Sequence, residues 1–359
     1  MSSCNNSRRR FLRRASAASA ACIIPCFIAC AKEKVSGKSG WETGKQINPA
    51  IENLRVVCCH DPSMVRTDPV KWDMAGQNAP VVRERVHKNL DEMAKSLAQV
   101  DSTSAAWSKI FKKAKQKQWR EVKVAIKVNC ISKNHPRYAV VEKICLVLHD
   151  LGIPYSNIII YDALSDAIKH YQQAVEKELP AGIVVSSKAD ALGGMVETYV
   201  PQPISAKYNC VKDLAEGSID ILINIAVNKG CNKTVGGLTL SLKNHAGTFN
   251  PKPIHMGGGM DYLLAFNRSE AIVGGSPVRQ QLCVIDSLWG AKKGPWGAAD
   301  KRLSRLIMGT FSPALDYLTA KKIREPLLDA EHNGIERFLT SFGYTIPDNL
   351  DIINVAPAA

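Results

Sequence analysis

The sequence lacks the short motifs that mark the commonest enzyme classes. It contains no Gly-x-Ser-x-Gly nucleophile elbow, no phosphate-binding Walker loop, no dinucleotide-binding glycine fingerprint and no His-Glu-x-x-His zinc motif. The enzyme classes built on these motifs therefore lose support. Internal repeats and low-complexity tracts are also missing, which excludes a repeat architecture.

The 11 cysteines do not form a ligand pattern. Some lie in the first thirty residues, and the others are scattered, without a Cys-x-x-Cys pair among them. Those in the body of the chain are Cys58, Cys59, Cys130, Cys145, Cys210, Cys231 and Cys283. A self-contained zinc or iron–sulfur ligand set is therefore not encoded. A metal ion or an iron–sulfur cluster stays open as a cofactor, without a motif that supports either.

Long apolar runs are missing beyond residue 31, since no later segment approaches the roughly eighteen apolar residues of a membrane-spanning helix. The first 31 residues are different. Ser7-Arg-Arg-Arg-Phe-Leu-Arg13 matches the twin-arginine pattern, and residues 15–31 are small, apolar and uncharged. The sequence therefore predicts a twin-arginine signal peptide over residues 1–31. The translocase of that pathway is the expected partner during export, and the periplasm or cell envelope is the destination.

The end of this leader allows two outcomes. Ala29-Cys30-Ala31 fits the small-x-small cleavage rule, which predicts a cut after Ala31. Phe27-Ile28-Ala29-Cys30 resembles a lipoprotein box, in which Cys30 would carry lipid. Both outcomes stay open, and lipid on Cys30 is the only membrane attachment that the sequence suggests.

The charge balance is basic, with 47 Lys and Arg against 33 Asp and Glu, a formal net charge of +14. The predicted leader holds arginines but no acidic residue, so the rest of the chain remains basic. In an exported protein this balance favours an anionic small molecule as ligand, and nucleic acid is not an expected partner.

The pattern of apolar residues predicts an α/β fold with a mostly parallel central sheet, helices on both faces, and the signal segment outside the fold. Strands are expected at 54–59, 122–128, 158–161, 183–186, 219–227 and 283–286. Helices are expected at 81–100, 107–119, 137–151, 164–179, 312–323 and 331–342. The expected organisation is a polar tether over 32–50, a single α/β domain over 51–345 and a C-terminal tail over 346–359.

Polar residues at the ends of the expected strands are the first candidates for a site, because ligands of open parallel sheets bind beyond the carboxyl ends of strands. The strand at 122–128 leads to Lys127 and Asn129, the run at 219–227 leads to Lys229, and the strand near 284 leads to Asp286. Together with Lys243, the residues Lys127, Lys229 and Asp286 are the catalytic candidates. Asp162, at another strand end, is interpreted as the cap of the following helix.

The most distinctive stretch, residues 234–247, is interpreted as a glycine-rich turn that opens a short helix. Backbone donors at a helix start favour anions, so Gly236, Gly237 and Asn244 are ligand-binding candidates, as are Asn129 and Asp316. A purely structural role is equally open, because Lys243 complements the helix dipole. His245 and Cys231 are the candidate metal ligands.

The same segments resemble the family catalogued as domain of unknown function 362 (DUF362). The resemblance rests on Val124-Ala-Ile-Lys127-Val-Asn129, on the strand into Asn228-Lys229 and on Thr239-Leu-Ser-Leu-Lys243-Asn244-His-Ala-Gly247, and it spans roughly residues 120–320. Residues 284–289, 294–295 and 312–316 are similar to the family's closing motifs. Members are sometimes joined to iron–sulfur modules, but the resemblance implies no defined reaction. This chain has no cysteine-rich ferredoxin segment, and it carries Lys229-Gly230-Cys231 where members often show Lys-Thr-His.

Three functions remain open on these grounds. The first is an exported enzyme or cofactor protein that holds an anionic group, a metal or a cofactor in a crevice lined by Lys and Asn. The second is a non-catalytic binding protein of the envelope, whose lysines recognise an acidic ligand. The third is an iron–sulfur-associated redox protein.

Overall fold

The computed structural model describes residues 44–68, 74–131, 134–162, 165–187, 191–295 and 299–359. The predicted signal peptide at 1–31, including Cys30, lies outside the described residues, as does most of the expected tether. The chain from Gly37 to Ala359 forms one compact unit. In the described part of the chain, no helix combines the length and apolar character needed to cross a membrane.

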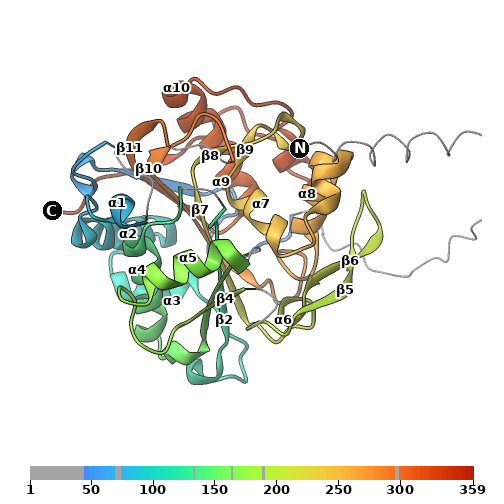
Figure 1. Cartoon of the computed structure of the whole chain (residues 1–359), viewed down its shortest axis with the longest axis horizontal. Coiled ribbons are helices and arrows are strands. Elements are labelled where there is room, and N and C mark those ends of the chain that lie inside the picture. Colours follow the sequence, from blue (N-terminus) through green and yellow to red (C-terminus); the bar gives the residue numbers. More distant parts are fainter. Residues whose placement is uncertain (1–43, 69–73, 132–133, 163–164, 188–190, 296–298) are drawn as a thin grey trace, which may run out of the picture. The chain divides into compact units, whose positions relative to one another are not determined.

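An eight-stranded sheet forms the centre of this unit, in the order β12-β1-β11-β10-β7-β2-β3-β4 (Figure 1). The neighbouring strands from β10 to β4 are parallel to one another, whereas β11 runs antiparallel to both β10 and β1. The strands are β1 (Val56–His60), β2 (Val124–Val128), β3 (Ile158–Asp162), β4 (Val184–Ser187), β7 (Ile221–Val227), β10 (Gln280–Gly290), β11 (Lys301–Gly309) and β12 (Ile353–Val355). The predicted α/β class with a mostly parallel sheet is confirmed.

Side chains alternate along the strands and give the sheet two buried faces. In β2, Val124 and Ile126 belong to one apolar core and Ala125 to the other. The first face, called here the α2 face, packs against α2 (Arg83–Ala98), α3 (Thr103–Ile110), α4 (Tyr138–Asp150) and α5 (Ser165–Val175). The second, the α7 face, packs against α7 (Ser241–Asn244), α8 (Gly259–Arg268), α9 (Ser312–Thr319) and α11 (Arg337–Thr340). Figure 1 shows α3 and α4 on one side of β2 and β7, and α7 and α8 on the other.

Smaller elements complete the unit. An antiparallel hairpin joins β5 (Met195–Val200) to β6 (Ala206–Val211), and a shorter one joins β8 (Lys229–Gly230) to β9 (Leu238–Thr239). The remaining α-helices that the structure describes are α1 (Met74–Asn78), α6 (Lys212–Ala215) and α10 (Glu325–Leu328). The β8–β9 hairpin continues directly from β7, so it places the glycine-rich turn beside the carboxyl edge of the sheet.

Two expected helices are shorter than the sequence suggested. The helix expected at 107–119 ends at Ile110, because the polar run that follows offers no apolar face to bury. Of the helix expected at 331–342, only Arg337–Thr340 is α-helical.

The tertiary fold also adds strands that local patterns did not indicate. β11 reaches the sheet through a hairpin from β10, and its register shifts between Ser287 and Trp289. Residues 346–359, expected to be a tail, include β12, which pairs with β1. Ile352, next to β12, is buried, so burial of apolar side chains explains why this segment joins the sheet.

Candidate functional site

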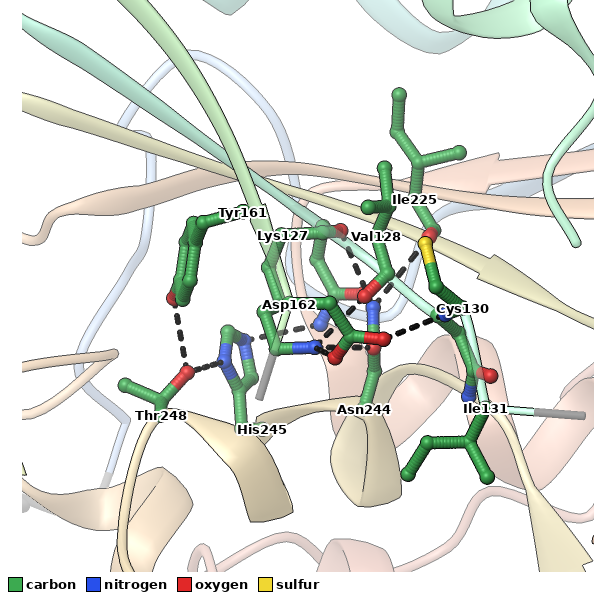
Figure 2. Close-up of polar contacts among 12 residues, drawn as sticks. Lys127, Val128, Cys130, Ile131, Tyr161, Asp162, Ile225, Asn244, His245 and Thr248 are labelled. Atoms are coloured by element: carbon green, nitrogen blue, oxygen red, sulfur yellow. Dashed lines mark hydrogen bonds and ion pairs between the residues drawn. The ribbon is translucent and has the colours of Figure 1, made fainter. Parts of the chain in front are cut away.

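A buried ion pair between Lys127 and Asp162 lies at the centre of the carboxyl edge of the sheet. The Lys127 Nζ donates to Asp162 Oδ1 at 2.6 Å, to the carbonyl oxygen of Val128 at 2.7 Å and to Asn244 Oδ1 at 3.0 Å. Asp162 Oδ2 accepts from the backbone N–H of Cys130 at 2.5 Å. Figure 2 shows these groups converging from β2, β3 and α7. All three donors of the ammonium are used, so this pair ties the two strands to α7.

A hydrogen-bonded chain runs from this pair across the α7 face. Tyr161 Oη lies 2.8 Å from Thr248 Oγ1, which lies 3.0 Å from His245 Nδ1 (Figure 2). On the other side of the ring, His245 Nε2 contacts Gln280 Oε1, and Asn224 contacts both Gln280 and Asn244. Burial lowers the pKa of His245 to about 3, so its ring is neutral. Both ring nitrogens therefore already have partners within the protein.

Lys229 occupies a separate position at the same edge. Its amine is fully buried and donates to Asn129 Oδ1 at 2.9 Å and to the carbonyl oxygen of Ile131 at 2.6 Å. Among the described residues, no carboxylate lies within 4.0 Å of this nitrogen. Burial lowers the pKa of Lys229 to about 7, against the opposing influence of Asp162. Lys229 is therefore a buried amine with no carboxylate partner among the described residues, and its pKa lies near neutral.

Lys127, Lys229 and Asp162 all lie close enough to Cys130 to change the pKa of its thiol. Burial raises the pKa of the Cys130 thiol, Asp162 raises it further, and both lysines oppose this rise. Lys243 lies close to the same group: burial lowers its pKa, Cys231 raises it and the charge of Lys127 lowers it. The structure thus brings Lys127, Asn129, Lys229, Lys243 and Asn244 to the same edge of the sheet.

Asp286 lies on the opposite face of the sheet. Its carboxylate accepts from the backbone N–H of Arg137 at 2.7 Å, and it forms an ion pair with Arg137 Nε at 3.3 Å. The Arg137 guanidinium also lies 4.8 Å from the ring centroid of Trp289. Both partners of the ion pair are completely buried. Asp286 is therefore engaged with Arg137 on the α2 face rather than with Lys127 on the α7 face.

The glycine-rich turn does open a short helix, as expected, but a carboxylate of the protein itself occupies the start of that helix. Asp316 accepts from the backbone N–H groups of Ser241 and Leu242 at 2.9 and 2.7 Å. Burial raises the pKa of Asp316 to about 7, although these two bonds lower it. Gly236 and Gly237 have φ values of 86° and 79°, which explains glycine at both positions.

The two candidate metal ligands, His245 and Cys231, have different surroundings: His245 is fully buried and Cys231 is not. Cys231 is partly exposed, and the cysteines of the described chain are free thiols. Within the described ranges, no group of three or more His, Cys, Asp or Glu side chains is arranged to hold a metal ion. His245 is built into the hydrogen-bonded chain above. The prediction of a metal at His245 or Cys231 thus gains no further ligand from the fold.

Several buried charged residues near the carboxyl edge of the sheet were not among the candidates that the sequence indicated. Asp162 was interpreted as a helix cap, yet it pairs with Lys127. Arg137 and Arg324 are completely buried, and Arg324 is held by Asn228, His332 and the carbonyl oxygens of residues 291 and 292. The position of Asp162 at the end of an apolar strand was the signal that could have identified it. Neither arginine stands in a motif, so only the tertiary fold reveals them.

The fold and these groups define an α/β protein with an open, mostly parallel sheet and a lysine- and asparagine-rich cluster at its carboxyl edge. The family described as "Domain of unknown function (DUF362)" matches residues 124–321, and the chain belongs to this family. That range runs from β2 to the helix after α9, so it contains the whole cluster. A comparison with curated proteins found no match.

Proposed function

We propose that this protein binds a small anionic molecule at the carboxyl edge of its sheet, with the Lys229 amine as the central group. The observation that carries the proposal is the environment of this amine, which is fully buried and, within the described ranges, is held by two neutral oxygens alone. A buried cation without a countercharge is costly, and a bound anion would supply the missing charge.

The other cations at this edge support the same conclusion. Lys243 is half-buried and contacts the neutral ring of His255, and Arg324 is held by neutral acceptors. No carboxylate lies within 4.0 Å of either charge among the residues that the structure describes. By contrast, the charges of Lys127 and Arg137 are balanced by Asp162 and Asp286. The unbalanced charge at the edge is therefore positive.

The lowered pKa of Lys229 couples binding to proton uptake. Near neutral pH the amine is partly deprotonated, and an anion would favour its protonated form. Affinity should therefore fall as the pH rises above about 7. The Lys229 amine itself is fully buried, so a ligand that contacts it must displace neighbouring side chains.

Calorimetric titration of the whole chain with inorganic phosphate and with acetate, at several pH values, tests this proposal. We expect binding of at least one of these anions, proton uptake on binding, and loss of binding in Lys229→Met. Lys233→Met is the matched control, because Lys233 is exposed and forms an ion pair with exposed Glu331. Binding that survives in Lys229→Met, or no binding of either anion to the unaltered protein, would refute the proposal.

The same lowered pKa favours a second candidate, catalysis. An amine that is partly neutral at pH 7 can accept a proton from a bound ligand, as a general base does. Native mass spectrometry of the purified protein would identify a retained ligand. The NMR spectrum of that ligand would then be followed over time in the presence of the protein, to detect its conversion. Conversion by the unaltered protein but not by Lys229→Met supports an enzyme, whereas an unchanged spectrum supports a binding protein.

We also propose export by the twin-arginine pathway, on the strength of the Ser7–Arg13 motif and the uncharged segment that follows it. Replacing Arg8 and Arg9 together by Lys should retain the protein in the cytoplasm, whereas the same change at Arg14 should not. Cell fractionation measures the difference. Equal export of the two variants would contradict this assignment.

A further inference from the structure

A second group of buried donors lies on the α2 face, close to Lys229 but outside the residues that sequence patterns indicated. It consists of Asn134, Arg137 and Tyr171, whose side chains are all completely buried. Asn134 and Arg137 lie in the segment that links β2 to α4, and Tyr171 lies on α5. These three residues are called the Arg137 cluster below.

The cluster contains donors for which the described part of the chain supplies no acceptor. Asn134 Nδ2, Arg137 Nη2 and the Tyr171 hydroxyl make no hydrogen bond with any residue that the structure describes. Buried donors of this kind are rare in native proteins, because each one loses its bonds to water without a replacement. Three neighbouring donors in this state indicate an acceptor that is not part of the chain.

The three side chains are neighbours. Arg137 Nη1 donates to Asn134 Oδ1 at 2.6 Å, which leaves the amide nitrogen of Asn134 beside the guanidinium. The Tyr171 ring packs edge-on against Tyr138, the residue after Arg137, with 6.1 Å between ring centroids. Tyr171 also lies near enough to Arg137 to raise the pKa of the guanidinium, against the larger lowering by burial. The three side chains therefore belong to one buried region on the α2 face.

The other face of the guanidinium is already engaged. Arg137 Nη1 also reaches Gln77 Oε1 at 3.1 Å and the carbonyl oxygen of His135 at 2.5 Å, and Nε pairs with Asp286. Trp289 stacks against the plane. These contacts fix the orientation of the fork, so Nη2 is held in place for a partner and little side-chain entropy would be lost on binding.

An approach to this region exists on the surface. A hollow of about 440 Å³ lies beside α4 and α5 and is lined by, among others, Asn78, Arg83, Tyr138 and Lys177. Its volume is in the range of small-molecule sites. Since Tyr138 both lines the hollow and packs against Tyr171, the hollow ends at the wall of the Arg137 cluster. Displacement of the Tyr138 ring would connect the two.

We infer that Asn134, Arg137 and Tyr171 form the subsite for the oxyanion of the bound ligand, a carboxylate or a phosphate. This inference rests on the proposed function, because Lys229 supplies the positive charge that balances the anion: Arg137 and Lys229 are close enough for the arginine to influence the amine. Asp286 already neutralises Arg137, so the cluster contributes aligned donors and Lys229 contributes the net charge.

Tyr171→Phe tests the subsite with two readouts. Because the hydroxyl has no partner, its removal should leave the ligand-free protein equally stable or more stable. The affinity for phosphate or acetate should fall about tenfold, since one hydrogen bond to a charged group is lost. Tyr344→Phe is the control: its hydroxyl accepts a hydrogen bond from Asn53, so this variant should lose stability and keep its affinity.

Asn134→Asp is the second variant. It retains the oxygen that accepts from Arg137 and replaces the free donor by a carboxylate oxygen, so affinity should fall more than tenfold. Separate titrations with phosphate and acetate distinguish the two kinds of oxyanion, and the anion that loses affinity in both variants is the ligand class.

The outcomes separate this inference from the proposed function. If the unaltered protein binds neither anion, both fail. If Lys229→Met abolishes binding while Tyr171→Phe and Asn134→Asp bind normally, the subsite is refuted and the proposed function stands. A loss of stability in ligand-free Tyr171→Phe equal to that in Tyr344→Phe would show that the hydroxyl has a partner, such as water, and would also refute the subsite.

Discussion

Replacing Lys229 by Met should change how the stability of the protein depends on pH. Burial places the pKa of this amine at about 7, whereas its ordinary value is 10.5. Between these two values the unfolded chain holds a proton on Lys229 and the folded chain largely does not. The free energy of unfolding therefore rises with pH across this window, because the unfolded state binds more protons.

The size of the effect follows from the two pKa values. A single proton gives a slope of at most about 1.4 kcal/mol per pH unit, and the difference between 10.5 and about 7 corresponds to at most about 5 kcal/mol. Solvent screening reduces this little, since the side chain is completely buried. Below about pH 7 both states are protonated, and Lys229 contributes no slope.

Urea unfolding from about pH 6 to about pH 10 measures this contribution. Several buried cysteines have raised pKa values and act in the opposite direction, because the unfolded chain loses their protons first. The contributions of Cys58 and Cys59 are common to both proteins and cancel in the difference between the unaltered chain and Lys229→Met, whereas that of Cys130 does not, because Lys229 itself lowers the pKa of this thiol. That difference should rise with pH, whereas the corresponding difference for exposed Lys233→Met should stay flat. A flat curve for Lys229→Met would refute the reasoning.

Two further predictions concern the groups around this site. Asp162→Asn should lower the free energy of unfolding by about 3–5 kcal/mol, because it leaves the Lys127 ammonium buried without its carboxylate partner. Adding Lys127→Met should recover part of this loss. If urea unfolding shows that the losses of the two single variants simply add, the pairing is contradicted. Asp316 has a raised pKa of about 7, so the folded state holds its proton longer and stability should fall as the pH rises from about 4 to about 7. In Asp316→Asn this fall, at most about 4 kcal/mol, should disappear from thermal unfolding measured across that range, and its persistence would show that another group titrates.

Which of the candidate lysines lacks a carboxylate partner was open from the sequence, because three lysines stood in similar patterns. Lys127 and Lys229 both follow apolar strands, and Lys243 stands near a helix end. The fold distinguishes them by their partners: Lys127 pairs with Asp162, whereas Lys229 has only neutral acceptors. A partner that is distant in the sequence cannot be inferred from a local pattern, so this distinction required the tertiary structure.

The sequence by itself determined the α/β class and the strands β2, β3, β4 and β7. Apolar alternation at 122–128 and the continuous apolar run at 219–227 are local consequences of burial, so they can be recognised without the fold. It also indicated which strand ends would carry polar groups at one edge. Lys127, Asn129 and Lys229 follow from that rule, because parallel strands end together, whereas Asn244 was indicated by the glycine-rich turn.

Only the tertiary structure decided which face of the sheet each of these side chains occupies and what it contacts. Asp286 lies on the α2 face with Arg137, and Asp316 caps α7 from another helix. The antiparallel β11 and the terminal β12 likewise depend on pairing between distant segments. The physical reason is the same in each case: hydrogen bonds and charges select partners by distance in space, and the sequence pattern specifies only distance along the chain.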